Sequence, residues 1–471
     1  MFKKVLIANR GEIALRIIRA CKELDIRTVA IHSEADSTAR YVKKADEGYL
    51  VGPGPVAGYL NIYGIVDLAK QVGADAIHPG YGFLAENADF AKACADAGIT
   101  FIGPHPRAIK EMGLKIEARK MMKDIGVPII PGSEALRDLK QAIKTAKEIG
   151  YPVMIKASAG GGGRGLRICR NDADIRRQMS IAQAEALKAF GNDSVFIEKY
   201  IEEPHHIEFQ LVADKHGNIV HLGERDCSIQ RRHQKLIEIA PSLILDETLR
   251  RKMGEAAIKA AQSVDYDSIG TVEFLVDKER NFYFLEMNTR IQVEHTITEE
   301  ITGIDLVQTM IRSAAGEKLP FTQDEISLTG YAIQCRINAE DPLNDFLPDT
   351  GTVTSYYSPG GFGVRIDGHV YRGYTVPAFY DSMLLKQIVW GRTWEEAVRR
   401  MRRCLGEYVI RGIKTTIPFY IKVMEDRVFK GGQFTTSYVQ ERLPLLLYLQ
   451  DRDPMDTVVS IAAAIVAHSK L

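Results

Sequence analysis

The stretch Glu286-Met287-Asn288-Thr289-Arg290-Ile291-Gln292-Val293-Glu294 decides how the rest of the chain is interpreted. Every second residue is polar and able to take part in chemistry, and the residues between them can face a core. Because side chains alternate between the two faces of a strand, the pattern predicts one strand with a polar face and a buried face. Two carboxylates, a guanidinium and two amides on one face suit a bound ligand better than they suit water.

A second strand is predicted just upstream of this stretch. Residues 271–276 are rich in β-forming side chains, and residues 277–281 have the composition of a turn. A hairpin about this turn brings Glu273 opposite Glu286, at a spacing of about 5 Å where like charges repel. A divalent cation such as Mg²⁺ removes the repulsion, and Asn288 adds another oxygen. The alternative is a pair of surface acids that merely face each other.

Composition limits the class of protein. The chain has 471 residues, which predicts two to four domains, and its 61 basic and 61 acidic residues cancel. We therefore expect no binding to nucleic acid or to a membrane. The six cysteines are scattered without a CxxC pair, which argues against a zinc site or a disulfide framework. With Arg10 too early for a signal peptide, we expect a cytoplasmic protein.

The N-terminal third alternates strands and helices. A strand at residues 4–8, a turn at Asn9-Arg10-Gly11, a helix near 12–23 and a strand at 28–32 form a β-α-β unit. The alternation continues to a strand at 100–102, and it predicts a Rossmann-like parallel sheet. The loop from His78 to Leu84 follows a strand, where open sheets bind ligands, although a tight structural turn explains it equally well. One continuous helical stretch is predicted at 107–125.

A glycine-rich loop lies in the middle of the chain. The predicted strand at 152–156 ends in Lys156, and Ala159-Gly160-Gly161-Gly162-Gly163-Arg164-Gly165 follows. Such a loop is rich in backbone N–H groups and can close over phosphates as a mobile lid. A flexible linker is the alternative.

Residues 223–235 are dense in charge but lie between apolar segments, which favours a polar loop of a binding site. In the region after residue 330, the alternation at 331–340 directs Arg336 to the same cleft.

Together these motifs resemble the biotin carboxylases of the ATP-grasp superfamily. The matching stretches are residues 7–14, 78–84, the four-glycine loop, 224–235 and 286–295. The resemblance implies an α/β and α+β chain with a Rossmann-like domain at 1–113, an ATP-grasp domain at 114–329, a lid at about 131–203, a biotin carboxylase C-terminal domain at 330–446 and a helical tail at 447–471. It also implies a reaction, in which ATP and bicarbonate give carboxyphosphate and CO₂ passes to N1 of biotin.

The resemblance assigns roles by position. It implies Mg²⁺ (or Mn²⁺) at Glu273, Glu286 and Asn288, and bicarbonate at Arg290, Gln292 and the Val293 backbone. Glu294 would be the base, Arg336 would stabilise the ureido oxygen of biotin, and Lys235 would support carboxyphosphate, with Arg290 as the fourth catalytic residue. Nucleotide contacts would come from Lys115, Lys156, Gly161, Gly162, Gly163, Glu198, Lys199, Ile201, His206, Gln230, His233 and Leu275.

The chain departs from the family pattern at three positions. Leu114 stands where Asp is common, Thr296 where Pro is usual and His205 where Arg is common. None of these changes removes a catalytic group. Alternatives are another ATP-grasp carboxylating ligase, or an inactive nucleotide-binding regulatory subunit. We expect a homodimer that works with a separate biotin carboxyl carrier protein and a carboxyltransferase subunit. The sequence at 238–245 favours pyruvate over acetyl-CoA as the final acceptor.

Overall fold

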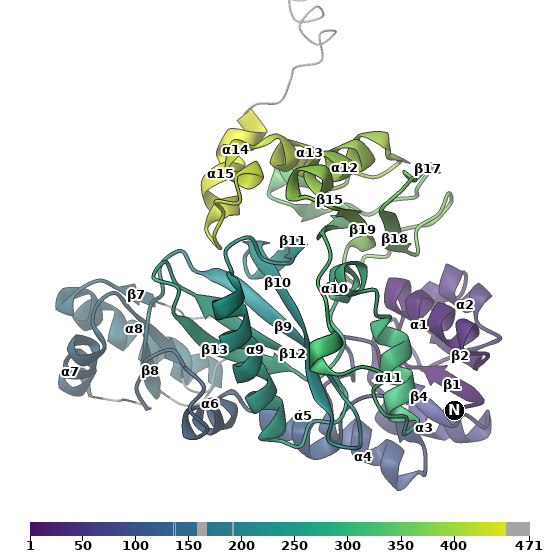
Figure 1. The fold of residues 1–471 in the computed structure, drawn as a ribbon, viewed down its shortest axis with the longest axis horizontal. Coiled ribbons are helices and arrows are strands. Elements are labelled where there is room, and N and C mark those ends of the chain that lie inside the picture. Colours follow the sequence, from purple (N-terminus) through teal and green to yellow (C-terminus); the bar gives the residue numbers. More distant parts are fainter. Residues whose placement is uncertain (135, 137, 158–166, 191–192, 449–471) are drawn as a thin grey trace, which may run out of the picture.

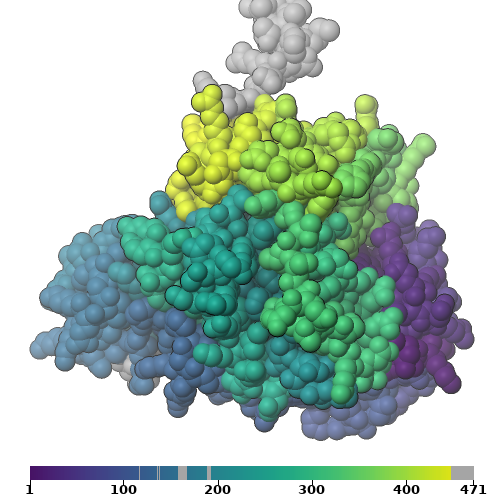
Figure 2. All heavy atoms as spheres, in the orientation of Figure 1, coloured from purple at the N-terminus to yellow at the C-terminus, as the bar shows by residue number. Residues whose placement is uncertain are grey.

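The computed structural model describes residues 1–134, 136, 138–157, 167–190 and 193–448 (Figure 1). The four-glycine loop and all but the first two residues of the predicted helical tail at 447–471 lie outside these residues. The described chain forms a parallel sheet near the N-terminus, a large central sheet, a small sheet beside it and a helical C-terminal region. Figure 2 shows the C-terminal region resting on the central part, with the small sheet's region and the N-terminal region on opposite sides.

The N-terminal sheet has five parallel strands in the order β3-β2-β1-β4-β5. This order confirms the predicted Rossmann-like fold. Apolar strand residues such as Leu6 and Ile31 are fully buried between the helices. The elements are β1 (Lys4–Ile7), α1 (Gly11–Glu23), β2 (Arg27–His32), η1 (Glu34–Asp36), α2 (Arg40–Lys44), β3 (Glu47–Leu50), η2 (Ala57–Leu60), α3 (Ile62–Gln71), β4 (Ala76–His78), α4 (Ala88–Asp96) and β5 (Thr100–Phe101).

The central sheet has eight strands in the order β13-β12-β9-β10-β11-β14-β19-β18. All its neighbours pair antiparallel. Its strands are β9 (His205–Ala213), β10 (Ile219–Arg231), β11 (Gln234–Ala240), β12 (Ile269–Val276), β13 (Phe282–Asn288), β14 (Tyr331–Asn338), β18 (Val364–Gly368) and β19 (Met383–Gly391). The connecting helices include α5 (Pro106–Gly113), α6 (Lys115–Asp124), α9 (Glu247–Gln262), α10 (His295–Thr302) and α11 (Leu306–Ala314), with η3 at Gln323–Glu325.

The small sheet has its own core. Its strand order is β7-β6-β8, and α7 and α8 pack on it (Figure 1). The elements are α7 (Leu139–Ile149), β6 (Val153–Ala157), β7 (Arg167–Cys169), α8 (Asp172–Phe190) and β8 (Val195–Lys199). This region contains most of the predicted lid at 131–203.

The C-terminal region continues the central sheet. Its first strand, β14, pairs with β11, so the predicted boundary at residue 330 lies between two strands of one sheet. The division into four domains stays a prediction. The remaining elements are β15 (Glu340–Asp341), η4 (Pro342–Asn344), β16 (Leu347–Pro348), β17 (Ser355–Tyr357), α12 (Trp394–Glu407), β20 (Val409–Arg411), α13 (Ile417–Glu425), α14 (Arg427–Lys430) and α15 (Tyr438–Tyr448).

The structure corrects three predicted elements. The strand predicted over 286–294 ends at Asn288, and residues 289–294 are a connection that leads into α10. The helix predicted at 107–125 is two helices, because Leu114 has an extended backbone (φ −89°, ψ 93°) between them. Residues 223–231 belong to strand β10, and only Arg232 and His233 form a turn, both with positive φ. Charge alone therefore misidentified a buried strand as a loop.

Candidate active site

One cleft brings the predicted site residues together. It has a volume of about 2620 Å³ and is lined by residues from all four regions of the chain. Each predicted site residue within the described part of the chain lies on its wall; Gly161, Gly162 and Gly163 fall outside that part. Those on the wall are Lys115, Lys156, Glu198, Lys199, Ile201, His206, Gln230, His233, Lys235, Glu273, Leu275, Glu286, Asn288, Arg290, Gln292, Val293, Glu294 and Arg336.

The predicted hairpin places two acids side by side. Glu273 of β12 pairs directly with Glu286 of β13, as the sequence predicts. On its other side Glu273 pairs with Glu208 of β9, so three carboxylates form a row across three neighbouring strands. Glu208 was not predicted, although the alternation of polar and apolar residues at 206–211 was a signal for it. Such a row requires cations close by.

Lys235 of β11 supplies one of these cations. Its ammonium lies 2.5 Å from Glu208, 3.0 Å from Glu273 and 2.8 Å from Glu294. Burial alone lowers the pKa of Lys235, but the three carboxylates outweigh it and hold this pKa well above its ordinary value. Lys235 is therefore a permanent positive charge at the centre of the site.

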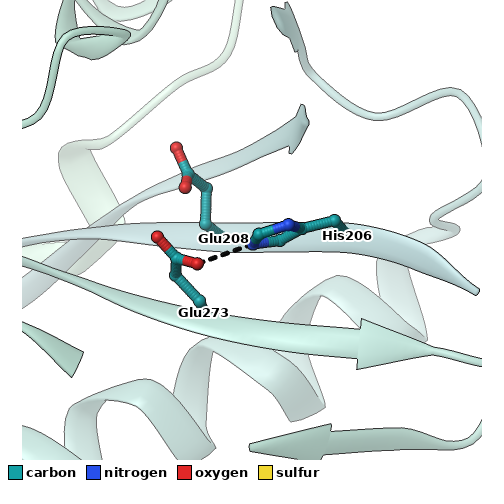
Figure 3. A group of neighbouring side chains, drawn as sticks. All are labelled: His206, Glu208 and Glu273. Atoms are coloured by element: carbon teal, nitrogen blue, oxygen red, sulfur yellow. Dashed lines mark hydrogen bonds and ion pairs between the residues drawn. The ribbon is translucent and has the colours of Figure 1, made fainter. Parts of the chain in front are cut away.

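His206 and Glu208 of β9 and Glu273 of β12 form a tight group that a metal ion could use (Figure 3). Figure 3 shows both carboxylates projecting from the same face of the sheet. The imidazole Nε2 is 2.7 Å from Glu273, and the Gln230 amide lies 3.3 Å from Nδ1. Since the Gln230 amide donates to Nδ1, the hydrogen that His206 donates to Glu273 is on Nε2. Lys235 donates to both carboxylates as well, so these side chains belong to one hydrogen-bonded network.

The predicted Mg²⁺ ligands have suitable chemistry. Glu286 is half-buried, and its carboxylate contacts Lys115 at 2.8 Å. Glu273 accepts hydrogen bonds from Asn288 at 2.8 Å and from Gln292 at 2.7 Å, while the Asn288 oxygen accepts from Arg290 at 2.9 Å. Two carboxylates on facing strand positions with an adjacent amide match a hard cation with oxygen ligands. The residues present therefore fit Mg²⁺.

Glu294 is an almost fully buried acid of the site. It is 2% exposed, and it lies between Lys235 at 2.8 Å and Arg336 at 3.0 Å. Burial raises the pKa of Glu294, but Lys235 and Arg336 outweigh burial and hold this pKa below its ordinary value. Arg336 also donates to Glu238 at 2.5 Å, and burial raises the pKa of that carboxyl. Glu294 is thus an ionised carboxylate between two cations.

The connection after β13 is held by its polar side chains. Arg290 donates to Glu86 of the N-terminal region at 2.9 Å, and the Thr289 amide donates to the same carboxylate at 3.2 Å. The Gln292 oxygen accepts from Arg225 at 2.8 Å. These contacts replace the strand ladder that the alternation predicted beyond Asn288, and they direct the polar side chains into the cleft.

Arg225 is a site residue that was not predicted from the sequence. Its guanidinium is fully buried behind the cleft, where it also donates to Glu208 at 2.5 Å. It therefore links the Gln292 amide to the carboxylate row. Its place in the charge-dense stretch 223–235 was the available signal.

The side of the cleft where nucleotide contacts are predicted is rich in lysine. The ammonium of Lys156 contacts Glu198, which also contacts Arg119. Burial, with Arg119 and Lys115 nearby, lowers the pKa of Lys156 to about 8. Lys199 donates to the carbonyls of residues 150 and 151, at 2.9 and 3.0 Å, so its side chain is used structurally. His233 is exposed at the rim in the turn between β10 and β11.

Family models match three consecutive parts of the chain. Residues 1–109 match the biotin carboxylase N-terminal domain, residues 115–322 the ATP-binding domain of the carbamoyl-phosphate synthase L chain, and residues 334–441 the biotin carboxylase C-terminal domain. The chain belongs to the biotin carboxylase family. As a member, it is an ATP-dependent carboxylating ligase that acts on biotin, and its cofactors are ATP and Mg²⁺.

Relatives of this biotin carboxylase are similar over nearly its whole length. The 2-oxoglutarate carboxylase small subunit of Hydrogenobacter thermophilus is 56% identical over 100% of both chains. A pyruvate carboxylase subunit of Methanothermobacter thermautotrophicus is 55% identical over 94% of this chain and 90% of its own. A crystal structure of the H. thermophilus biotin carboxylase domain dimer with MgADP and bicarbonate has a TM-score of 0.89 and 57% identity, covering 95% of this chain and 98% of that one.

Two departures from the family pattern have visible consequences. Leu114 is the residue before α6, and it offers no side-chain oxygen to the free N–H groups of that helix, which begins with Lys115. Thr296 is buried at the start of α10, and its hydroxyl donates to the Gln334 amide oxygen of β14. The first change leaves a helix end uncapped, and the second adds a hydrogen bond between helix and sheet.

Among the helices that the structure describes, none is long and apolar enough to cross a membrane.

Proposed function

We propose that this chain carries out the first half-reaction of a two-part carboxylase through the residues of the cleft. In this reaction ATP and bicarbonate give carboxyphosphate, and CO₂ then passes to N1 of biotin on a separate carrier. The observation that carries the proposal is the position of Glu294, held between Lys235 and Arg336 on the wall that also contains Glu273 and Glu286. A base, two cations and a metal-type acid pair are the groups that this reaction needs.

Binding of bicarbonate is assigned to the connection after β13. Arg290 offers a planar guanidinium that matches the planar charge of bicarbonate. Gln292 and the Val293 backbone add hydrogen-bonding groups beside it. On the nucleotide side, Lys115 and Lys156 hold the phosphates, and Glu198, Lys199 and Ile201 form the adenine hinge, with the remaining contacts as the family resemblance implies.

Mg²⁺, held by Glu273, Glu286 and Asn288, would neutralise charge on the phosphate oxygens of ATP. Lys115 contacts Glu286 in the free protein at 2.8 Å. We infer that Lys115 leaves this carboxylate for a phosphate when the nucleotide enters. The carboxylate then becomes available to the cation that accompanies ATP.

Glu294 acts as the general base. It removes the proton of bicarbonate while a bicarbonate oxygen attacks the γ-phosphorus and the bond to ADP breaks. Before substrate enters, Lys235 and Arg336 hold the carboxylate ionised. A bound anion shares these two cations, so the proton affinity of Glu294 rises when a proton has to be taken. Carboxyphosphate then breaks into CO₂ and phosphate, and the phosphate accepts the N1 proton of biotin as N1 bonds to CO₂. Glu294 gives its proton to the departing phosphate and is ionised again.

Arg336 stabilises the charge that develops on biotin. Its Nε and one Nη2 hydrogen are used by Glu238 and Glu294, and the other N–H groups remain available to the ureido oxygen. Lys235 stays beside the carboxyphosphate. Both side chains come from neighbouring parts of one sheet, so the groups for the two chemical steps are held at fixed positions.

The final acceptor is proposed to be a 2-oxo acid. The relative that aligns over the whole chain is named for 2-oxoglutarate, and a second relative is named for pyruvate. We propose a cytoplasmic homodimer that works with a biotin carrier and a carboxyltransferase on another chain. The H. thermophilus domain, which crystallised as a dimer, supports the first part of this assembly.

The test is ATP hydrolysis by the purified chain. We expect hydrolysis that depends on bicarbonate and is stimulated by free biotin, with formation of carboxybiotin. A rate of ATP hydrolysis that changes neither with bicarbonate nor with biotin would refute the proposal. Offering pyruvate, 2-oxoglutarate and acetyl-CoA to the complex purified with its partners then identifies the acceptor.

A further inference from the structure

A buried lysine behind the bicarbonate segment has no role in the mechanism above. Lys386 of β19 is 0% exposed, and its ammonium lies 3.1 Å from Glu12 of α1 and 2.9 Å from the carbonyl oxygen of Val293. In the sheet Lys386 pairs directly with Arg336. It thus occupies the strand position next to the arginine assigned to biotin, and it faces the segment assigned to bicarbonate.

The contact joins three distant parts of the chain. Glu12 lies in the first turn of α1, Val293 in the connection after β13, and Lys386 in the C-terminal region. The loop at 78–84 is attached as well, because the Tyr81 hydroxyl donates to the Glu12 oxygen that faces Lys386. This loop was a candidate ligand loop in the sequence, and the mechanism above gives it no role.

Stability alone does not explain this ion pair. Burying an ammonium and a carboxylate costs several kcal/mol of desolvation each, and apolar residues of similar volume often do as well or better. Glu12 is 3% exposed, and its second oxygen has no hydrogen-bond partner within the described chain. Burying the pair therefore costs free energy of folding. One clear structural effect of the pair is that Lys386 fixes the position of the Val293 carbonyl.

We propose that Lys386 is a positioning residue for the bicarbonate segment. By holding the Val293 carbonyl it fixes the peptide between Val293 and Glu294, and with it the direction in which the Glu294 side chain leaves the backbone. Glu12 and Tyr81 hold Lys386 in turn, so the N-terminal region helps to orient the base. This inference rests on the proposed roles of Val293 and Glu294.

The experiment compares Lys386→Met, Glu12→Gln and the double variant with the wild type. Lys414→Met is the matched control, because Lys414 belongs to the same region, is exposed and pairs with Asp341 away from the cleft. The readouts are kcat and KM for bicarbonate, the KM for MgATP, the melting temperature, and hydrogen exchange of a peptide that covers residues 289–294.

Lys386→Met should lower kcat/KM for bicarbonate by about 100-fold, the effect of a reacting group displaced by about 1 Å. The KM for MgATP should stay within about twofold of the wild type, because the nucleotide side is untouched, and amide exchange at 293–294 should rise about tenfold. The double variant should regain the melting temperature lost in Lys386→Met, since it no longer buries an unpaired Glu12 carboxylate. It should not regain activity with bicarbonate.

Two results would overturn the inference: a normal kcat/KM for bicarbonate in Lys386→Met, or a double variant that recovers activity together with stability. Failure of the proposed function is a different result. In that case the wild type itself shows no bicarbonate-dependent hydrolysis, and hydrogen exchange at 289–294 still tests whether Lys386 holds the segment.

Discussion

Replacing Lys235 by Met should destabilise the protein, and the loss should depend on pH. The substitution keeps the length of the side chain and removes the cation that lies 2.8 Å from Glu294 and 3.0 Å from Glu273. Coulomb attraction at such a distance amounts to about 6 kcal/mol per pair at an effective dielectric of about 20. After desolvation of the lysine is subtracted, breaking a buried pair typically costs about 3–5 kcal/mol.

The pH dependence follows from the two carboxylates. In the wild type the pKa values of Glu273 and Glu294 lie below their ordinary values, so their stabilisation is complete at neutral pH and is lost only as the solution becomes strongly acidic. Without Lys235, buried carboxylates have pKa values above those of the unfolded chain. Protonation of these carboxylates then stabilises the variant as the pH falls. The difference in the free energy of unfolding between the variant and the wild type therefore becomes smaller between about pH 7.5 and about pH 5.

The assay is thermal unfolding at both pH values, with Lys414→Met as an exposed control. A loss of about 3–5 kcal/mol corresponds to a shift on the order of 10 °C for a unit of about 150–250 residues, and the control should shift far less. An equal shift at both pH values, or a shift no larger than that of the control, would show that Lys235 does not neutralise the carboxylate row.

Four further outcomes are expected. Glu294→Gln should bind MgATP normally and lose biotin carboxylation by about 100-fold or more; near-normal carboxylation contradicts its role as base. Glu286→Gln should need more Mg²⁺ and turn over more slowly, and an unchanged Mg²⁺ titration excludes this carboxylate from the metal site. Hydrogen exchange at 159–165 should fall when ATP is added, whereas equal exchange favours the linker alternative. Lys123 should carry no biotin, because it follows Met121-Met122 in helix α6 and does not lie in an exposed turn. A positive streptavidin blot of the purified chain would contradict this prediction.

Local features of the site were predictable because short-range geometry sets them. The turn at 277–281 is short, so the pairing of Glu273 with Glu286 followed from the two strand patterns and was confirmed. The polar residues of 290–294 do reach the cleft, although not on a strand. The alternation of polar and apolar residues predicted which side chains face the site. The backbone conformation of residues 289–294 depends instead on contacts with Glu86 and Arg225.

The partners of the site residues were not predictable. Glu208, Glu238 and Lys386 each lie in a mostly buried strand, and each meets its partner across 27 to 98 positions of sequence. A single sequence gives the residue type and the expected face of such a residue, but the neighbour depends on strand order in the sheet. The order β12-β9-β10-β11-β14-β19 brings these residues together, and no local pattern encodes it.

The continuity of the central sheet across residue 330 limits how this protein can be divided. A gene cut at that point would leave β11 without β14, and a row of unpaired N–H and C=O groups would become an open edge. Such an edge recruits other strands, so a truncated product should aggregate even if each half keeps its own apolar core. The small sheet β7-β6-β8 shares no strand with the central one. Experiments that exchange segments between relatives should therefore move that unit whole and leave the eight strands together.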